Sequence, residues 1–285
     1  MSKIKIVVDS TSGFDMMEKR YDAEVLRLFV FFDGKEYVDG VDITPEDFYR
    51  MLDENKDVLP STSQPTLGGT VEIFERLSKE GYEDIIAITI SSRLSGTYAT
   101  TVSARDMLDS DINVHVVDTL NVTYPVYFLG QIAYDMASEG KSAQEIVNHI
   151  EGIKGEYELY FAVGDLTLLR KNGRLSTASA LIGTVLKVKP VLKIDDDGTI
   201  QAVTKVRTMK KSLQELVNTF FEITDGKAED IVILNSNCVE LAEEFRGMLV
   251  SRDASLGNTP IYPITPVIGS HLGTGTVAIS FRKKN

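Results

Sequence analysis

The stretch that decides the fold runs from Lys3 to Gly13 and reads Lys-Ile-Lys-Ile-Val-Val-Asp-Ser-Thr-Ser-Gly. Its first part is a short run rich in β-branched residues, which is typical of a buried strand in a parallel sheet. The run ends in small polar residues, as loops that follow such strands commonly do. The same order recurs at Ile85 to Ile90 and at Asn113 to Val117, each followed by small polar residues and a helical pattern. The sequence therefore predicts an α/β domain with a mostly parallel sheet.

The second half of the chain carries a different pattern. Two strands are predicted at 188–194 and 199–207, on either side of the turn sequence Asp195-Asp196-Asp197-Gly198. Asp and Gly tolerate the unusual backbone angles of tight hairpin turns. Adjacent antiparallel strands indicate an α+β domain. Further elements are expected at 212–221 and 239–249 as helices, and at 230–234, near Ile261 and at 276–281 as strands.

A chain of 285 residues exceeds the usual size of a single hydrophobic core, which favours two domains. The pattern changes after a helix predicted near Gln144 to Glu151, in a region that holds Gly152 and Gly155. We therefore predict an N-terminal α/β domain over residues 1–152 and a C-terminal α+β domain with a mixed sheet over residues 153–285.

The composition excludes several classes of protein. Hydrophobic residues make up 43% and charged residues 25%, as in ordinary globular proteins. One cysteine, Cys238, forms no internal disulfide, and with three histidines it does not supply a structural zinc site. No apolar run is long enough for a signal-peptide core or a membrane span. We expect a cytoplasmic protein without a bound metal.

The net charge of −12 argues against general nucleic-acid binding, which depends on Lys and Arg neutralising phosphates. The charge is unevenly spread, because residues 170–211 hold ten Lys and Arg against three Asp. The Lys and Arg side chains of this segment either form an anion-facing surface or are simply solvated side chains of two strands and a helix.

Two hydroxyl-rich segments are candidate anion sites. Ser61 to Thr66 holds three consecutive hydroxyls before Pro65, at a predicted helix start, and it suits either an anion or a plain helix cap. Ser91 to Thr97 lies at a strand-to-helix junction, where Gly96 permits close backbone approach and Ser95 offers a hydroxyl. Neither segment has a Walker or Gly-x-Gly-x-x-Gly pattern, so nucleotide binding is not supported.

Two further segments offer a histidine and an arginine. His271 lies among Gly269, Gly273 and Gly275, and we expect it in a flexible loop that approaches a ligand or stays on the surface. Arg174 follows Gly173 and either reaches a phosphate or carboxylate or is solvated beyond a helix end. His115 and His149 fit structural positions in a strand and a helix.

The order and spacing of six motifs across both halves resemble those of the DegV family. They are Asp9-Ser10-Thr11, Thr62-Ser63-Gln64-Pro65, Ser92 with Leu94-Ser95-Gly96-Thr97, Gly173-Arg174, Lys189-Pro190, and Gly269-x-His271-x-Gly273-x-Gly275. The resemblance implies a three-layer α/β/α N-terminal domain, an α+β C-terminal domain and a long-chain fatty acid buried between them.

The resemblance also implies roles for particular residues. Thr62 and Ser95 look like the carboxylate ligands, Ser63 and Gly96 add contacts, and Arg174 and His271 flank the head group. A separate ATP-binding subunit of a bacterial fatty acid kinase would phosphorylate the carboxylate, so this chain needs no cofactor and only transient membrane contact. The helix predicted at 178–186 and the strand at 191–194 are candidates for the tail pocket.

Two alternatives remain open at the level of sequence. One is an enzyme that acts directly on a small acyl or phosphorylated substrate, with His271 as acid or base near Ser95; a Ser-His-Asp hydrolase lacks the Gly-x-Ser-x-Gly elbow. The other is a lipid-sensing regulatory protein that contacts its partner through the basic segment 170–211.

Overall fold

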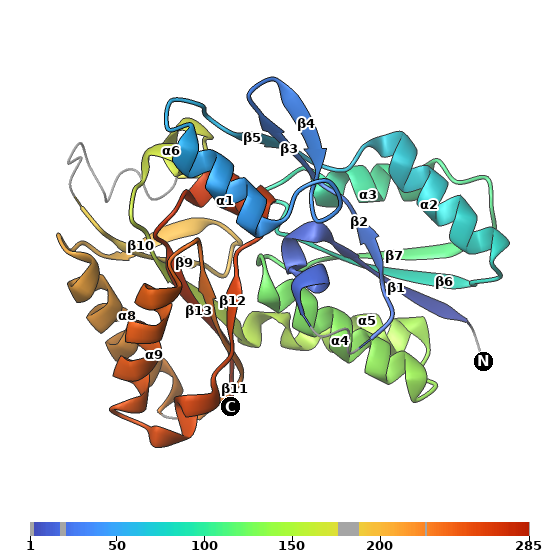
Figure 1. Ribbon diagram of the computed structural model, residues 1–285. Coiled ribbons are helices and arrows are strands. Elements are labelled where there is room, and N and C mark those ends of the chain that lie inside the picture. The colour runs from blue at the N-terminus through green and yellow to red at the C-terminus, as the bar shows by residue number, and fades with distance from the viewer. Residues whose placement is uncertain (1–2, 18–20, 176–187, 226, 285) are drawn as a thin grey trace.

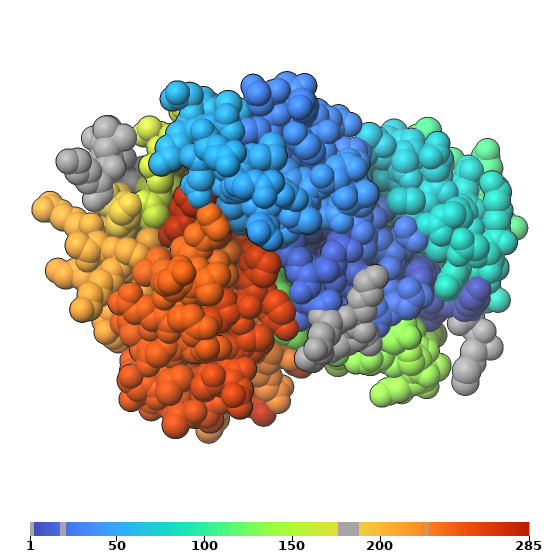
Figure 2. All heavy atoms as spheres, in the orientation of Figure 1, coloured from blue at the N-terminus to red at the C-terminus, as the bar shows by residue number. Residues whose placement is uncertain are grey.

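The computed structural model describes residues 3–17, 21–175, 188–225 and 227–284. It has an N-terminal α/β/α domain and a C-terminal α+β domain, which lie side by side in Figure 1 and Figure 2. The position of the boundary between residues 152 and 153 stays a prediction. None of the helices in the described part of the chain has the length and apolar character needed to cross a membrane.

The N-terminal sheet is entirely parallel, with the strand order β2-β1-β6-β7. Side chains of successive residues in a strand point to opposite faces. Ile6 and Val8 accordingly pack with α4 and α5, whereas Val7 packs with α2 and α3. The strands are Ile4–Asp9 (β1), Glu24–Leu26 (β2), Asp84–Thr89 (β6) and Asn113–Asp118 (β7). The helices are Leu67–Lys79 (α2), Thr97–Asp106 (α3), Tyr124–Ser138 (α4) and Ala143–Ile153 (α5), with the 3-10 turns Ser10–Ser12 (η1), Phe14–Met16 (η2) and Lys154–Glu156 (η3).

A small antiparallel sheet, which is not among the predicted elements, sits above the parallel one in Figure 1. It comprises β3 (Phe29–Phe32), β4 (Lys35–Val38) and β5 (Ser61–Ser63), and α1 (Pro45–Glu54) packs beside it. Asp33 and Gly34 join β3 to β4 with φ of 49° and 73°, as a two-residue hairpin of Asp-Gly type requires. This Asp-Gly pair is the sequence signal that indicates the hairpin.

The helix start predicted within Ser61 to Thr66 is found at the end of that segment, and the three consecutive hydroxyls lie outside the helix. Ser61–Ser63 pair as an edge strand with β3, and α2 begins only after Thr66, whose side chain accepts a hydrogen bond from the amide of Gly69. The hydroxyls of Thr62 and Ser63 therefore project from a strand and not from a helix N-terminus. The capping pattern holds at Thr66, whereas Ser61–Ser63 are extended because they pair with a strand some 30 residues away.

The C-terminal sheet is mixed, with the order β10-β9-β8-β13-β11-β12. The predicted hairpin around Asp195 to Gly198 is confirmed, since β9 and β10 pair antiparallel. Among the described strands of this sheet, only β11 and β12 are parallel neighbours. The strands are Tyr157–Ala162 (β8), Val191–Ile194 (β9), Ile200–Thr204 (β10), Ala228–Asn235 (β11), Ile261–Pro263 (β12) and Val277–Lys283 (β13), and the helices are Thr167–Lys171 (α6), Met209–Thr224 (α8), Val239–Val250 (α9) and Pro266–Leu272 (α10), with a 3-10 helix at Ala254–Asn258 (η4).

The two faces of the C-terminal sheet meet different partners. Helices α8 and α9 cover one face and form a compact apolar cluster with it. The other face joins a continuous apolar cluster that reaches α4 and α5 of the N-terminal domain. The molecule is hollowed within this second region, and the hollow is where the candidate site lies.

Candidate functional site

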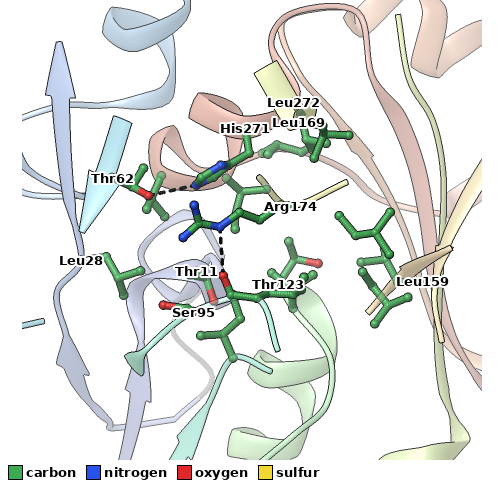
Figure 3. A pocket seen from close by; sticks show the side chains of 18 of the residues that line it. Thr11, Leu28, Thr62, Ser95, Thr123, Leu159, Leu169, Arg174, His271 and Leu272 are labelled. Carbon is green, nitrogen blue, oxygen red and sulfur yellow. Dashed lines mark hydrogen bonds between the residues drawn. The ribbon is translucent and has the colours of Figure 1, made fainter. Parts of the chain in front are cut away.

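A cavity of about 210 Å³ lies between the two domains (Figure 3). A single water needs roughly 10–15 Å³ of such space, so the cavity has room for a ligand of many atoms. Its walls are of two kinds. The apolar wall includes Val122, Leu159, Phe161, Ile194, Ile200, Leu234 and Ala278, and the polar end includes Thr11, Thr62, Ser63, Gln64, Ser95, Arg174 and His271.

The apolar wall follows from strand alternation. Leu159 and Phe161 of β8 point into the cavity, whereas Tyr160 between them packs under α8 and α9. In the strand 191–194, a predicted candidate for a tail pocket, Ile194 lines the cavity and Val191 belongs to the helix-covered face. The helix predicted at 178–186 lies outside the described residues.

The polar end is organised around a contact between β5 and α10. The Thr62 hydroxyl lies 2.9 Å from Nε2 of His271, although 209 residues separate them (Figure 3). The prediction that His271 occupies a flexible loop is wrong, because it lies in the last turn of α10. That helix packs on α1, β3 and β5, and Gly269 lets it approach Phe48 and Tyr49 so closely that a Cβ atom would clash.

Burial keeps His271 neutral. Desolvation, and to a smaller extent the nearby charge of Arg174, lowers its pKa to about 4. Within the described structure its Nδ1 atom is buried and has no hydrogen-bond partner. A neutral histidine with one free ring nitrogen can donate to or accept from a ligand, depending on its tautomer.

The second hydroxyl loop follows β6 and faces β5. Ser95 contributes a hydroxyl that lies 2.8 Å from that of Thr97, at the start of α3. Gln64 links the two loops by donating to the Thr100 hydroxyl at 2.9 Å. Gly96 lies directly against the Gln64 amide, where a Cβ atom would clash. It lines a neighbouring groove and not the cavity itself.

Arg174 closes the polar end from the C-terminal side. Gly173, with φ of 74°, turns the chain after α6, which is consistent with the helix end predicted there. The guanidinium donates to the carbonyl oxygens of Leu94 (3.3 Å) and Asn172 (2.6 Å). The Asn172 side chain in turn donates to the Ser270 carbonyl, next to His271, at 3.0 Å. Asn172 thereby connects Arg174 to the chain segment that carries His271.

The motif Asp9-Ser10-Thr11 has no role predicted from the sequence, yet it helps to build the site. Thr11 lines the cavity, and Asp9 holds it there by accepting hydrogen bonds from its hydroxyl and amide. Asp9 also accepts from the Ile90 amide at 2.6 Å, which ties the ends of β1 and β6 together. Burial raises the pKa of Asp9 to about 6 despite these hydrogen bonds. A buried acid directly after a strand was the available signal.

The arrangement supports binding more directly than hydrolysis. In the described structure His271 contacts Thr62, and the Ser95 hydroxyl contacts Thr97, so the two do not form a nucleophile and base pair. No cluster of acidic, Cys and His residues that could hold a metal occurs within the described ranges. The geometry suits an elongated molecule with an apolar body and a small anionic head.

Fold and site together define a two-domain α/β protein with an interdomain cavity that is polar at one end. A sequence model of the DegV family, described as uncharacterised, matches residues 3–284. The chain belongs to the DegV family. Among curated relatives, a DegV domain-containing protein of Staphylococcus aureus is 34% identical over 100% of both chains, and one of Listeria innocua is 36% identical over 99% of both.

Solved structures share the whole architecture. The fatty acid binding DegV family protein of Streptococcus agalactiae superimposes with a TM-score of 0.88 at 32% identity, and DegV, a fatty acid binding protein of Bacillus subtilis, with 0.87 at 30%. Both matches cover 100% of each chain. These similarities extend across both domains and therefore across the walls of the cavity.

Proposed function

We propose that the protein binds a long-chain fatty acid in the interdomain cavity, with the acyl chain along the sheet face and the carboxylate at the polar end. The observation that carries the proposal is the cavity itself, apolar along one sheet and polar at one end. The fatty acid binding of the Streptococcus agalactiae and Bacillus subtilis relatives supports it.

The apolar wall provides the driving force for binding. A chain of roughly 14 methylenes at ~0.8 kcal/mol each gains about 11 kcal/mol from burial, before the cost of ordering the ligand. No carboxylate side chain lines the cavity among the described residues, so the head group meets no like charge.

The polar end provides the head-group contacts. We assign the carboxylate to the hydroxyls of Thr62 and Ser95, with Ser63 and the backbone near Gly96 beside them. Arg174 adds a positive charge, and neutral His271 adds a hydrogen bond. Because most of these groups are neutral, the carboxylate is held without a permanent close ion pair and its oxygen remains a nucleophile.

We further propose that the bound carboxylate is presented to a separate ATP-dependent kinase subunit, which converts it to an acyl phosphate. The sequence carries neither of the two nucleotide-binding patterns considered above. Arg174 and His271 would then stand beside the phosphoryl group during transfer and stabilise its charge.

Native mass spectrometry of freshly purified protein, followed by organic extraction, tests the binding proposal. A stoichiometric fatty acid is expected, and its identity gives the chain length. A ligand-free mass together with failure to take up added fatty acid would refute the proposal. Acyl phosphate formation that requires both this chain and a kinase subunit tests the second step, and turnover by this chain alone would contradict it.

A further inference from the structure

One polar side chain of the cavity lies outside the proposed head-group site. Thr123 precedes α4, lines the cavity and is only 6% exposed. In Figure 3 it stands between Thr11, at the polar end, and Leu159, on the apolar wall. A hydroxyl group therefore lies beside the space in which the acyl chain is proposed to run.

The Thr123 hydroxyl lacks the hydrogen bond that a residue in its position normally makes. Thr44, Thr66 and Ser142 stand in the same position before α1, α2 and α5, and each accepts a hydrogen bond from a backbone amide of its helix. Thr123 makes no such bond to α4. Its Oγ1 atom is buried, and none of the described residues pairs with it. Buried polar atoms without a partner are rare, so this one calls for an explanation.

The backbone of Thr123 is strained as well. Its φ of 63° and ψ of −128° are unusual for any residue with a side chain, and more so for a β-branched one. The preceding turn holds it there through Asn121, whose carbonyl accepts from the Ser91 amide at 2.8 Å. The Asn121 side chain donates to the Tyr157 carbonyl and accepts from the Val122 amide, both at 3.0 Å. Strain of this kind persists where neighbouring contacts impose it, and it clusters at ligand sites.

Packing does not explain the hydroxyl. A valine has the same shape and would line the cavity, as Val122 does, without an unpaired polar atom. A plain hydrocarbon chain passing Thr123 would leave the oxygen unpaired, at a cost in free energy. A hydroxyl group on the passing chain would pair with it, since each hydroxyl can both donate and accept.

We propose that the cavity takes a fatty acid whose acyl chain carries a hydroxyl group, and that this group hydrogen bonds to Thr123. The inference rests on the proposed function and narrows its ligand class. A second charged group on the chain is not favoured, because Arg174, at the polar end, is the one charged side chain among the described residues that line the cavity. A neutral hydroxyl fits a wall that is otherwise apolar.

The test measures affinities for a saturated fatty acid and for its monohydroxy derivatives of the same length, with the hydroxyl moved stepwise along the chain. For each derivative, the affinity is divided by that for the parent acid. In the unaltered protein this ratio should peak at one hydroxyl position. Thr123→Val should lower the ratio at that position about 10-fold and leave affinity for the parent acid within about 2-fold, as loss of one buried hydrogen bond predicts.

Further variants separate the hydroxyl from the shape of the side chain. Thr123→Ser keeps the hydroxyl and should keep the ratio, whereas Thr123→Ala lacks it and provides a second variant that should lose the ratio. Val122→Ala is the matched control, because it alters a neighbouring cavity residue that has no polar side chain and should change all affinities alike. Thermal melting checks that each variant is folded.

The outcomes distinguish this inference from the proposed function. Ratios that do not differ between Thr123→Val and the unaltered protein at any hydroxyl position would overturn the inference and leave the proposed function intact. Failure of the unaltered protein to bind both the parent acid and its derivatives would instead refute the proposed function, and this inference with it.

Discussion

The two faces of the C-terminal sheet are built from the same strands but are packed differently. On β13, Val277 and Ile279 point under α8 and α9 into a filled core, whereas Ala278 between them faces the cavity. Strand alternation decides which residue faces which side. Whether a face is filled depends on what covers it: two helices pack closely against one face, and the N-terminal domain leaves space at the other.

The largest expected effect tests that difference directly. Ile279→Ala removes a fully buried side chain from the helix-covered face and should lower the free energy of unfolding by about 4 kcal/mol, because a new void forms in a packed core. Ile194→Ala on the cavity face should cost only about 2 kcal/mol, since space already lies beside that side chain. Chemical denaturation measures both, and equal losses would show that the two faces are packed alike.

Filling the cavity should separate binding from stability. Ala278→Phe places a ring in the space assigned to the acyl chain, and displacing about four methylenes should weaken fatty acid binding roughly 100-fold. The free energy of unfolding should change by no more than about 1 kcal/mol, because the cavity accommodates the ring. Titration with a fluorescent fatty acid and a thermal melt report the two quantities. Unchanged affinity in a folded variant would mean that the chain lies elsewhere.

The polar end should respond in the opposite way to the apolar wall. Thr62→Val keeps the size of the side chain but removes the hydroxyl that contacts His271 and, by our proposal, the carboxylate. Fatty acid affinity should fall about 10-fold through loss of this hydrogen bond. Ser61→Ala, an exposed neighbour on the same strand, is the control and should bind normally. Equal affinities of Thr62→Val and the control would remove Thr62 from the head-group site.

The smallest effect concerns pH. The pKa of His271 in the folded protein is lowered to about 4 from a usual 6.5, so between these values the unfolded chain binds a proton that the folded protein does not. This histidine should therefore cost about 1 kcal/mol of stability as pH falls from 7 to 5.5. His271→Asn should lose correspondingly less stability over that interval in denaturant titrations. Parallel pH profiles of the two proteins would show that His271 is not desolvated as described.

The carboxyl groups of Asp9 and Asp39 act with the opposite sign. Burial raises their pKa values to about 6 and about 7, so each contributes stability that is present below pH 3.8 and is lost as pH rises through the raised value. Asp39 accepts a hydrogen bond from the Val267 amide at the start of α10, the helix that carries His271. The variant His271→Asn isolates the histidine from this opposing background.

The sequence by itself determined the elements that depend on short-range pattern. The apolar runs at β1, β6 and β7, the Asp195 to Gly198 hairpin turn and the change of pattern near residue 152 predict a parallel-sheet domain followed by a mixed one. The order of its motifs also pointed to the DegV family, and the fold and the family are both confirmed. The assignment of particular site residues remains a proposal.

Only the tertiary structure decided where the polar groups stand. Ser61–Ser63 form a strand because β3 offers an edge, and His271 lies in a helix because α10 packs on α1 and β3. The contact of Thr62 with His271 joins segments 209 residues apart. The hollow between the domains likewise has no local signal, since residues that line a cavity and residues that fill a core carry the same apolar alternation, and only the fit of the covering surface distinguishes them.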